Sequence, residues 1–268
     1  MWSEVDTEEV RCCVCDLPGT SVYRLPPFGV VRCPRCELVF VSPRLRSDAL
    51  QRVYDDVGYF EGGVYGDQSD LSPAMLLQRT WMSGRLDLIR SALRRPQRGA
   101  RMLEIGCGYG LFLEAARSRG YEVAGVELSK PAAAHAREKL DRDVHCGQLE
   151  DAPLDAKFDV ITAWDTIEHV PNPLEFLRSA RKLLSDDGVI AFSTPYFSSL
   201  PATLLGTRWW TLKPTEHIWH FTPETHQLVF ARAGLAVTRI VRNPAARSNL
   251  GRLDSLVGLA RRLPDGAG

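Results

Sequence analysis

The sequence has no excess of charge of either sign and no long apolar run. Its 268 residues include 33 Lys and Arg and 33 Asp and Glu. A balanced charge argues against a general basic surface, so we expect no nucleic-acid partner. No apolar run approaches the roughly 20 residues that a membrane-spanning helix needs. The acidic start, MWSEVDTEEV, also lacks the apolar core of a signal peptide. We therefore expect a cytoplasmic protein with no integral membrane segment.

Cysteine is scarce after residue 36 and concentrated before it. Five of the seven cysteines lie in the first 36 residues, and four of them form the pairs Cys12-x2-Cys15 and Cys33-x2-Cys36. In a reducing compartment, two C-x2-C pairs favour a tetrahedral zinc site over disulfides. We expect these four thiolates to hold one structural zinc. The alternative is a set of four thiols without metal.

From residue 98 onward, short apolar runs alternate with helical patterns. Asn172 precedes one helix, and Thr222 precedes another that Gly234 ends. This alternation predicts an α/β fold, a doubly wound and mainly parallel sheet with helices on both faces. Ligands of such sheets bind at the carboxyl ends of strands, where the strand order reverses. The expected strands span 101–106, 121–128, 158–164, 189–193 and 235–241.

The chain divides into four expected regions. These are a zinc ribbon at 1–45, a helical and loop linker with a cofactor lid at 46–97, the α/β domain at 98–245, and a C-terminal helix or tail at 246–268. In the linker, the lid would use the aromatic side chains of Tyr59, Phe60 and Tyr65, unless this loop is only a packed connection. For the tail, packing on the core of its own chain is favoured over a partner-binding or membrane-surface helix.

The glycine-rich stretch LEIGCGYG, residues 103–110, follows an expected strand and precedes an expected helix. It lacks the Lys-Ser/Thr of a phosphate-binding loop, and its third glycine comes one residue too early for a dinucleotide loop. Gly106 and Gly108 allow a sharp turn and a close approach of a ligand. Glu127 ends the next expected strand, where a carboxylate can accept bonds from ribose hydroxyls. The alternative is a tight turn that holds no ligand.

LEIGCGYG, with GVELS and FDVITAWDTIEHV after it, resembles the class I S-adenosylmethionine-dependent methyltransferases over roughly residues 98–241. The resemblance implies a Rossmann-like domain whose loop holds the amino-acid part and ribose of S-adenosylmethionine. The glycine-loop residues would line the methionine part, Glu127 the ribose, and the remaining residues the adenine or the substrate side. The implied cofactor residues are Glu104, Gly106, Cys107, Gly108, Gly110, Glu127, Leu128, Gln148, Leu149, Trp164 and Asp165.

Methyl transfer to a hydroxyl needs alignment of the reacting atoms and a base for the proton. The block RWWTLKPTEHIWHFTPET resembles a segment of bacterial zinc-ribbon methyltransferases associated with polysaccharide genes. His217, with Glu216 beside it, is the first candidate base, and His169 is the second. If the segment is extended, only one of the two histidines faces the acceptor, and His220 would then act on substrate affinity or stability; in a helix or turn the two share a face and could act together.

The same block has an alternative interpretation, in which its aromatic residues only cover the edge of the sheet. A divalent cation is a further option near the candidate bases. Asp165, Glu168 and His169 have side chains that could hold Mg²⁺, although their spacing is not diagnostic.

The resemblance implies an O-methyltransferase acting on a small-molecule or glycan acceptor, with a sugar hydroxyl of a glycan or glycoconjugate as the first expectation. It leaves open, as one specific glycan, the oligosaccharide of the peptide-derived redox cofactor mycofactocin. One alternative is O- or N-methylation of a quinone or aromatic natural product. Another is a zinc-ribbon binding module with a non-catalytic cofactor domain, against which the intact glycines and Glu127 argue.

Overall fold

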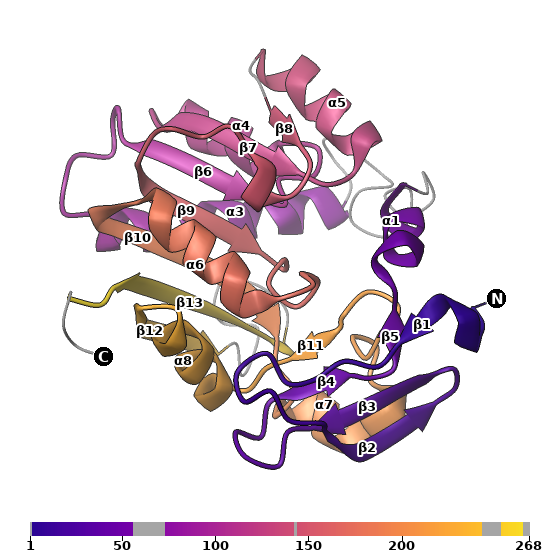
Figure 1. The fold of residues 1–268 in the computed structure, drawn as a ribbon. Helices are drawn as coiled ribbons and strands as arrows, with labels where there is room; N and C mark the ends of the chain where they lie inside the picture. The colour runs from indigo at the N-terminus through magenta and orange to yellow at the C-terminus, as the bar shows by residue number, and fades with distance from the viewer. Residues whose placement is uncertain (1, 56–72, 142–143, 243–252, 265–268) are drawn as a thin grey trace.

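The computed structural model describes residues 2–55, 73–141, 144–242 and 253–264 (Figure 1). Its centre is a seven-stranded sheet in the order β12-β13-β10-β9-β6-β7-β8. Strand β13 (Ser255–Arg262) is antiparallel to both of its neighbours, β10 and β12 (Leu235–Arg242). The strands that pair in parallel are β6 (Arg101–Ile105), β7 (Glu122–Glu127), β8 (Val144–Cys146), β9 (Phe158–Trp164) and β10 (Leu184–Pro195).

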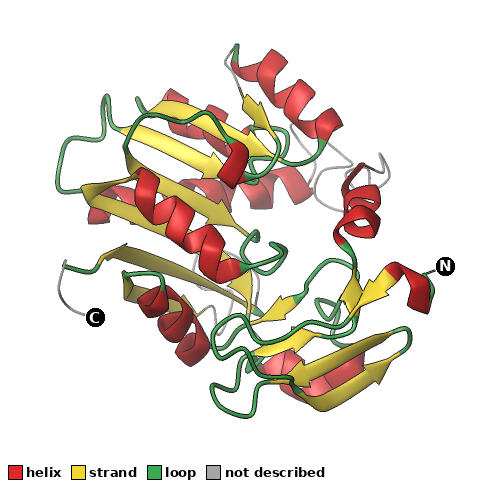
Figure 2. Cartoon of the chain, viewed as in Figure 1, coloured by secondary structure: helices red, strands yellow, loops and turns green. Residues whose placement is uncertain are grey.

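Helices cover both faces of this sheet, as the sequence predicts (Figure 2). Side chains on a strand alternate between faces: Met102 packs in one apolar cluster with Leu86 of a helix, and Leu103 packs in another with Leu177. In Figure 1, α6 lies in front of the sheet and α3 behind it. The helices are α3 (Pro73–Ala92), α4 (Leu111–Ser118), α5 (Lys130–Leu140), α6 (Pro173–Leu183) and α8 (Pro223–Arg232).

Three predicted helix ends are confirmed in atomic detail. Asn172 accepts hydrogen bonds from the backbone N–H groups of Leu174 and Glu175, at 3.1 and 3.3 Å, and so caps α6. Thr222 caps α8 in the same way, and Gly234 after that helix adopts a positive φ of 76°.

The predicted C-terminal helix is wrong, because residues 255–262 form β13. Leu256 and Val257 are buried on opposite faces of the sheet, since β13 lies between two strands and beneath helices on both sides. An apolar run that is buried on both faces has no polar–apolar alternation, so its pattern alone does not distinguish a strand from a helix. The tail thus packs on the core of its own chain.

The N-terminal region forms a four-stranded sheet in the order β11-β4-β3-β2, built of β2 (Thr20–Leu25), β3 (Phe28–Arg32), β4 (Val39–Val41) and β11 (Trp219–His220). Strand β11 lies between β10 and α8 in the sequence, but it pairs with β4 of the N-terminal region. The ring of Trp219 packs on Phe40 at 5.5 Å between centroids. The expected boundary at residue 45 therefore does not separate two cores.

The remaining described elements are short connections around these two sheets. Tyr59, Phe60 and Tyr65 of the expected lid lie outside the described residues. Among the described residues, every helix is too short or too polar to cross a membrane. The connections are β1 (Thr7–Glu8), β5 (Arg44–Leu45), α1 (Ser47–Asp55), α7 (Leu200–Leu205) and three 3₁₀ turns at Glu4–Asp6, Leu149–Asp151 and Gly206–Arg208.

The pairing of β10 with β13 leads to a stability prediction. Gly258 lies opposite Phe192, and a β-carbon at Gly258 would lie 2.2 Å from the Phe192 ring. We expect Gly258→Ala to lower the free energy of unfolding by about 1–3 kcal/mol, because overpacking a core strains it. Denaturant unfolding measures this. Adding Phe192→Leu to the variant should recover part of the loss, and an unchanged midpoint for the single variant would contradict the packing.

Candidate functional site

A cavity of about 970 Å³ lies at the carboxyl ends of the central strands. Strand order reverses between β6 and β9, since the chain runs outward through β7 and β8 before it returns to β9 beside β6. This is where open α/β sheets bind ligands. The predicted cofactor residues that line the cavity are Glu104, Gly106, Cys107, Gly108, Glu127, Leu128, Gln148, Leu149, Trp164 and Asp165.

The glycine loop forms the floor of the cavity. Gly106 and Gly108 have φ values of 72° and 51°, a region that favours glycine. A β-carbon on Gly106 would lie 2.7 Å from the hydroxyl of Thr166. Gly110 has a different place: it starts α4 with a φ of 75°, and a β-carbon there would meet Leu140 at 3.1 Å instead of the cavity. Gly110 thus shapes the turn, and the structure places it outside the cavity lining.

Glu127 is held in one orientation by the backbone. Its Oε2 accepts a bond from the N–H of Gly108 at 2.7 Å, and its Oε1 accepts one from Ser129 at 2.8 Å. Burial raises the pKa of this carboxyl, and the two N–H donors partly offset that rise. Each carboxylate oxygen has two lone pairs, so both can still accept a ribose hydroxyl. The geometry fits the role that the sequence predicts.

A buried carboxyl and a guanidinium lie at one end of the cavity. Glu104 is buried, its Oε2 has no hydrogen-bond partner in the described part of the chain, and burial raises its pKa well above the usual value. Arg85 from α3 lies over the ring of Trp164 at 4.5 Å, and its Nη2 is 3.9 Å from Asp165 Oδ2. An unsatisfied buried acceptor is costly, so its position indicates a cationic or donor group of a ligand.

Arg85 is the cofactor-side residue that the sequence does not reveal. It lies between apolar residues of a helix in the region expected to be a linker, where an arginine is usually a solvated surface group. The pair Arg85 and Glu104 matches the carboxylate and the ammonium of an amino acid. Together with the glycine loop and Glu127, it fits the methionine part and ribose of S-adenosylmethionine.

A second group of lining residues comes from the segment before β11: Trp210, Thr211, Lys213, Glu216 and His217. Trp210 is 50% exposed at its mouth, and His217 is buried deeper. The Nδ1 of His217 lies 2.6 Å from the backbone carbonyl of Thr211. A carbonyl can only accept, so Nδ1 carries a proton. This hydrogen bond fixes the direction of the His217 ring.

The structure brings the first and second candidate bases, His217 and His169, together. The rings of His169 and His217 meet edge to face at 4.7 Å, and His169 Nε2 lies 3.9 Å from Glu168 Oε1. Glu216 also lines the cavity, and its Oε2 is 3.6 Å from Lys213 Nζ. These residues come from the loop after β9 and from the segment before β11, so the fold joins two distant parts of the sequence.

His220 does not join this group. It lies in β11, is buried against Phe197 and Trp209, and is absent from the cavity lining. Burial lowers its pKa to about 3, with a further contribution from His217, so the ring stays neutral. The predicted role of His220 in substrate affinity has no contact to support it. Its place in the interface of two sheets indicates packing.

The cation that the sequence suggests near β9 is not supported in its predicted form. The ligand atoms of Glu168, His169 and His217 lie within 4.8 Å of one another, whereas Asp165 lies near Arg85. Mg²⁺ prefers oxygen ligands, and a set with two imidazoles suits it poorly. The predicted trio of Asp165, Glu168 and His169 therefore does not assemble as a Mg²⁺ site.

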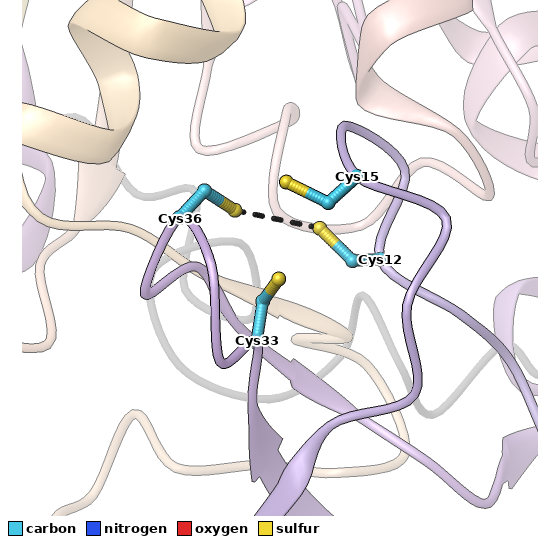
Figure 3. Close-up of side chains that lie close together, drawn as sticks. All are labelled: Cys12, Cys15, Cys33 and Cys36. Atoms are coloured by element: carbon cyan, nitrogen blue, oxygen red, sulfur yellow. Dashed lines mark hydrogen bonds between the residues drawn. The ribbon is translucent and has the colours of Figure 1, made fainter.

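The four N-terminal cysteines point toward one centre (Figure 3). The Sγ atoms of Cys12, Cys15, Cys33 and Cys36 lie within 4.8 Å of one another, and those of Cys12 and Cys36 are 3.5 Å apart. A closed set of four thiolates fits a structural zinc and leaves no open coordination position. Cys13 lies outside the cluster, as expected for the fifth cysteine.

The two cysteine pairs have the same backbone conformation. In one, Asp16 N donates to Cys12 O at 2.9 Å, and in the other, Glu37 N donates to Cys33 O at 3.0 Å. Both Asp16 and Glu37 have a positive φ, at 50° and 61°. Two matching turns that face one another present four sulfurs in the way that one tetrahedral ion requires.

Residues 77–240 match a family model described as a methyltransferase domain. Among curated proteins, the ubiquinone biosynthesis O-methyltransferase of Actinobacillus pleuropneumoniae is 38% identical over 107 residues, 36% of this chain and 46% of that protein. The protein of the same name from Azoarcus sp. is 32% identical over 155 residues, 55% of this chain and 59% of that one. The chain thus spans about half the length of the curated relatives it matches.

Solved structures share the fold at low identity. Magnesium protoporphyrin IX methyltransferase from Synechocystis PCC 6803 with bound S-adenosylhomocysteine has a TM-score of 0.59 at 16% identity, covering 81% of this chain and all of that one. The mitomycin 7-O-methyltransferase has a TM-score of 0.58 at 16% identity, covering 80% of this chain and 60% of that one. At this identity the likeness shows the fold alone.

Glu127 gives a test of the cofactor site. We expect Glu127→Ala to weaken S-adenosylmethionine binding by roughly 1.5–3 kcal/mol, the usual contribution of hydrogen bonds to a charged acceptor. Calorimetry measures the affinity. Glu122→Ala is the matched control, because Glu122 is exposed at the other end of the same strand. Equal affinities for the two variants would remove Glu127 from the cofactor.

The cysteine cluster gives a test by metal analysis. We expect about one zinc per chain, because four thiolates complete one tetrahedral site. Cys33→Ser should lose that metal and lower the stability of the N-terminal region, since metal binding contributes to folding. Cys146→Ser, which removes a thiol outside the cluster, should retain it. Carefully purified protein that contains no metal would contradict the zinc assignment.

Proposed function

The chain belongs to the methyltransferase domain family, and from this premise we propose that it is an S-adenosylmethionine-dependent O-methyltransferase. One observation carries the proposal: a single cavity is lined by the glycine loop, by Glu127 and by the buried imidazole of His217. A donor site and a proton acceptor that share one cavity are what transfer to a hydroxyl requires.

On the donor wall, three charged side chains would orient the cofactor. Glu127 would hold the ribose, Glu104 the ammonium, and Arg85 the carboxylate of the methionine part. The bound cofactor would supply an electrophilic methyl group on a sulfonium. The rigidity of this wall matters because in-line displacement depends on alignment, and a shift of about 1 Å can cost on the order of 10²-fold in rate.

On the acceptor wall, His217 Nε2 would take the hydroxyl proton as the acceptor oxygen attacks the methyl carbon. The carbonyl of Thr211, which already accepts from Nδ1, would stabilise the imidazolium that forms. The carboxyl of Glu168 lies beside His169, at 3.9 Å, and in its ionised form it would stabilise an imidazolium nearby. His169 is the second candidate for the base.

The first candidate acceptor is a phenolic hydroxyl of a quinone precursor or a related aromatic compound. The relatives named above as ubiquinone biosynthesis O-methyltransferases support it over a sugar. A phenol loses its proton near pH 10, within the range that an adjacent imidazole can assist. Trp210, half-exposed at the cavity mouth, offers a flat face on which an aromatic ring can stack.

The second candidate is the sugar hydroxyl of a glycan or glycoconjugate. Trp210, Lys213 and Glu216 lie together at the cavity lining, and an aromatic face beside polar groups also suits a sugar ring. A sugar hydroxyl is a far weaker acid than a phenol, so this acceptor would depend more strongly on the base. The zinc ribbon in either case would be structural, supporting the wall that carries His217.

Product analysis separates the two acceptors. The purified protein would be incubated with methyl-labelled S-adenosylmethionine and a panel of catechols, hydroquinones and oligosaccharides, followed by mass spectrometry. Label on a phenolic oxygen supports the first candidate and label on a sugar oxygen the second. Tight cofactor binding with transfer to neither class would favour a non-catalytic binding module.

His217 gives the test of the base. We expect His217→Ala to lower kcat by about 10²–10⁴-fold, the usual contribution of general-base catalysis, with cofactor affinity nearly unchanged. In the wild type the rate should fall as pH is lowered, since a protonated imidazole cannot accept a proton, and this fall should be lost in the variant. His135→Ala, an exposed position on α5, is the control. Full turnover with an unchanged pH profile would move the role to His169.

A further inference from the structure

The segment that carries His217 has almost no regular secondary structure. Between the 3₁₀ turn at Gly206–Arg208 and β11, the chain makes turns only. The N–H groups of Glu216 and His217 both donate to the carbonyl of Lys213, at 2.9 and 2.8 Å. These bonds shape the turn itself but do not attach it to the rest of the protein. The position of His217 therefore depends on contacts at the two ends of the segment and on the contact of its ring with His169.

The downstream end is attached by backbone bonds. Ile218 N and Trp219 N both donate to the carbonyl of Glu168, at 2.9 and 3.1 Å, and Val41 N donates to Ile218 O at 2.9 Å. These bonds fix the backbone that follows His217. They leave the rotation of the imidazole undetermined, because none of them involves its ring.

The upstream end is attached by one carboxyl from the C-terminal part of the chain. Asp254 is 0% exposed, and its Oδ2 accepts from Trp209 Nε1 at 2.9 Å and from Thr211 Oγ1 at 2.8 Å. Its own backbone is fixed, since its carbonyl accepts from Tyr196 N at 2.9 Å just beyond β10. Asp254 thus links the ends of β10 and β13 to the acceptor wall.

Thr211 connects this carboxyl to the imidazole. Its hydroxyl donates to Asp254, and its carbonyl accepts from His217 Nδ1 at 2.6 Å. The carbonyl and the hydroxyl belong to one buried residue, so fixing the second restricts the first. Asp254 also holds the residues on both sides of Trp210, which lines the mouth of the cavity.

We propose that Asp254 is a positioning residue for His217: through Thr211 it holds the carbonyl that accepts the Nδ1–H, and so fixes the direction of the imidazole. This inference rests on the proposed function, in which His217 is the base. A purely structural role would predict lower stability with an intact reaction. The connection through Thr211 predicts instead a selective loss of the base, because an imidazole whose Nδ1–H loses its fixed acceptor changes its orientation and its tautomer.

The kinetic test uses Asp254→Ala and Asp254→Asn. We expect the alanine variant to lower kcat by about 10²-fold, the effect of a small misplacement of a reacting group, with little change in cofactor affinity. The asparagine variant keeps an oxygen that can accept both bonds, so it should recover most of the rate. Thr211→Val removes the hydroxyl but leaves the carbonyl, and its loss should lie between these two.

Gly258→Ala is the stability control, since it strains β13 against Phe192 without touching residues 209–217. It should lower stability while leaving kcat close to that of the wild type. If Asp254→Ala folds and keeps full kcat, or if Gly258→Ala at equal stability loses as much kcat, the proposal is overturned. A parallel loss of cofactor affinity in Asp254→Ala would likewise overturn it, because the effect would then not be selective.

A second measurement separates this inference from the proposed function. Nitrogen-15 spectra of the His217 ring, assigned by comparison with His217→Ala, distinguish the Nδ1–H from the Nε2–H form. We expect the Nδ1–H form in the wild type and in Asp254→Asn, and a mixture in Asp254→Ala. An unchanged tautomer in Asp254→Ala overturns the positioning role. If His217→Ala keeps full turnover, the proposed base fails, while the spectra still decide whether Asp254 positions the ring.

Discussion

The structure depends on one backbone acceptor, the carbonyl of Glu168. It lies in the loop after β9, at the edge of the cavity, and accepts from both Ile218 N and Trp219 N. Those two residues lead into β11, which pairs with β4 of the N-terminal sheet. The central sheet, the acceptor wall and the cysteine-bearing region therefore meet at one point. This contact fixes the backbone on the downstream side of His217, as Asp254 fixes Trp209 and Thr211 on the upstream side.

Two buried acidic groups, Glu104 and Glu127, line the cavity. Burial raises the pKa of both; at Glu104 the charge of Arg85 opposes that rise and the charge of Glu127 adds to it. A carboxyl whose pKa is higher in the folded than in the unfolded state costs stability above its unfolded pKa, because folding then opposes its ionisation. Strain of this kind is common at functional sites. A bound ligand with a positive ammonium or sulfonium group would stabilise the ionised carboxylates. Its binding would therefore offset the stability that is lost when these buried groups ionise.

The parts predictable from sequence are those governed by short-range rules. Apolar strands before glycine, the caps at Asn172 and Thr222, and the cysteine pairs each follow from residues within a few positions of one another. The remainder depends on long-range contacts. β13 lacks alternation because it is buried on both faces, and β11 is too short to have a pattern of its own. Arg85 and Asp254 resemble ordinary surface charges until the fold buries them.

The acceptor is the hardest property to infer, for a reason that the architecture makes clear. The donor wall is built from the strand ends of a common sheet, whereas the acceptor wall is assembled from a turn-rich segment, the N-terminal sheet and the residue before β13. Proteins of this fold act on partners as different as a magnesium protoporphyrin and a mitomycin. Fold and family thus indicate the donor half of the reaction, and the acceptor must be argued from Trp210, Thr211 and His217. In the function proposed above, the flat face of Trp210 and the oriented imidazole of His217 in the same cavity would suit a ring with an acidic hydroxyl.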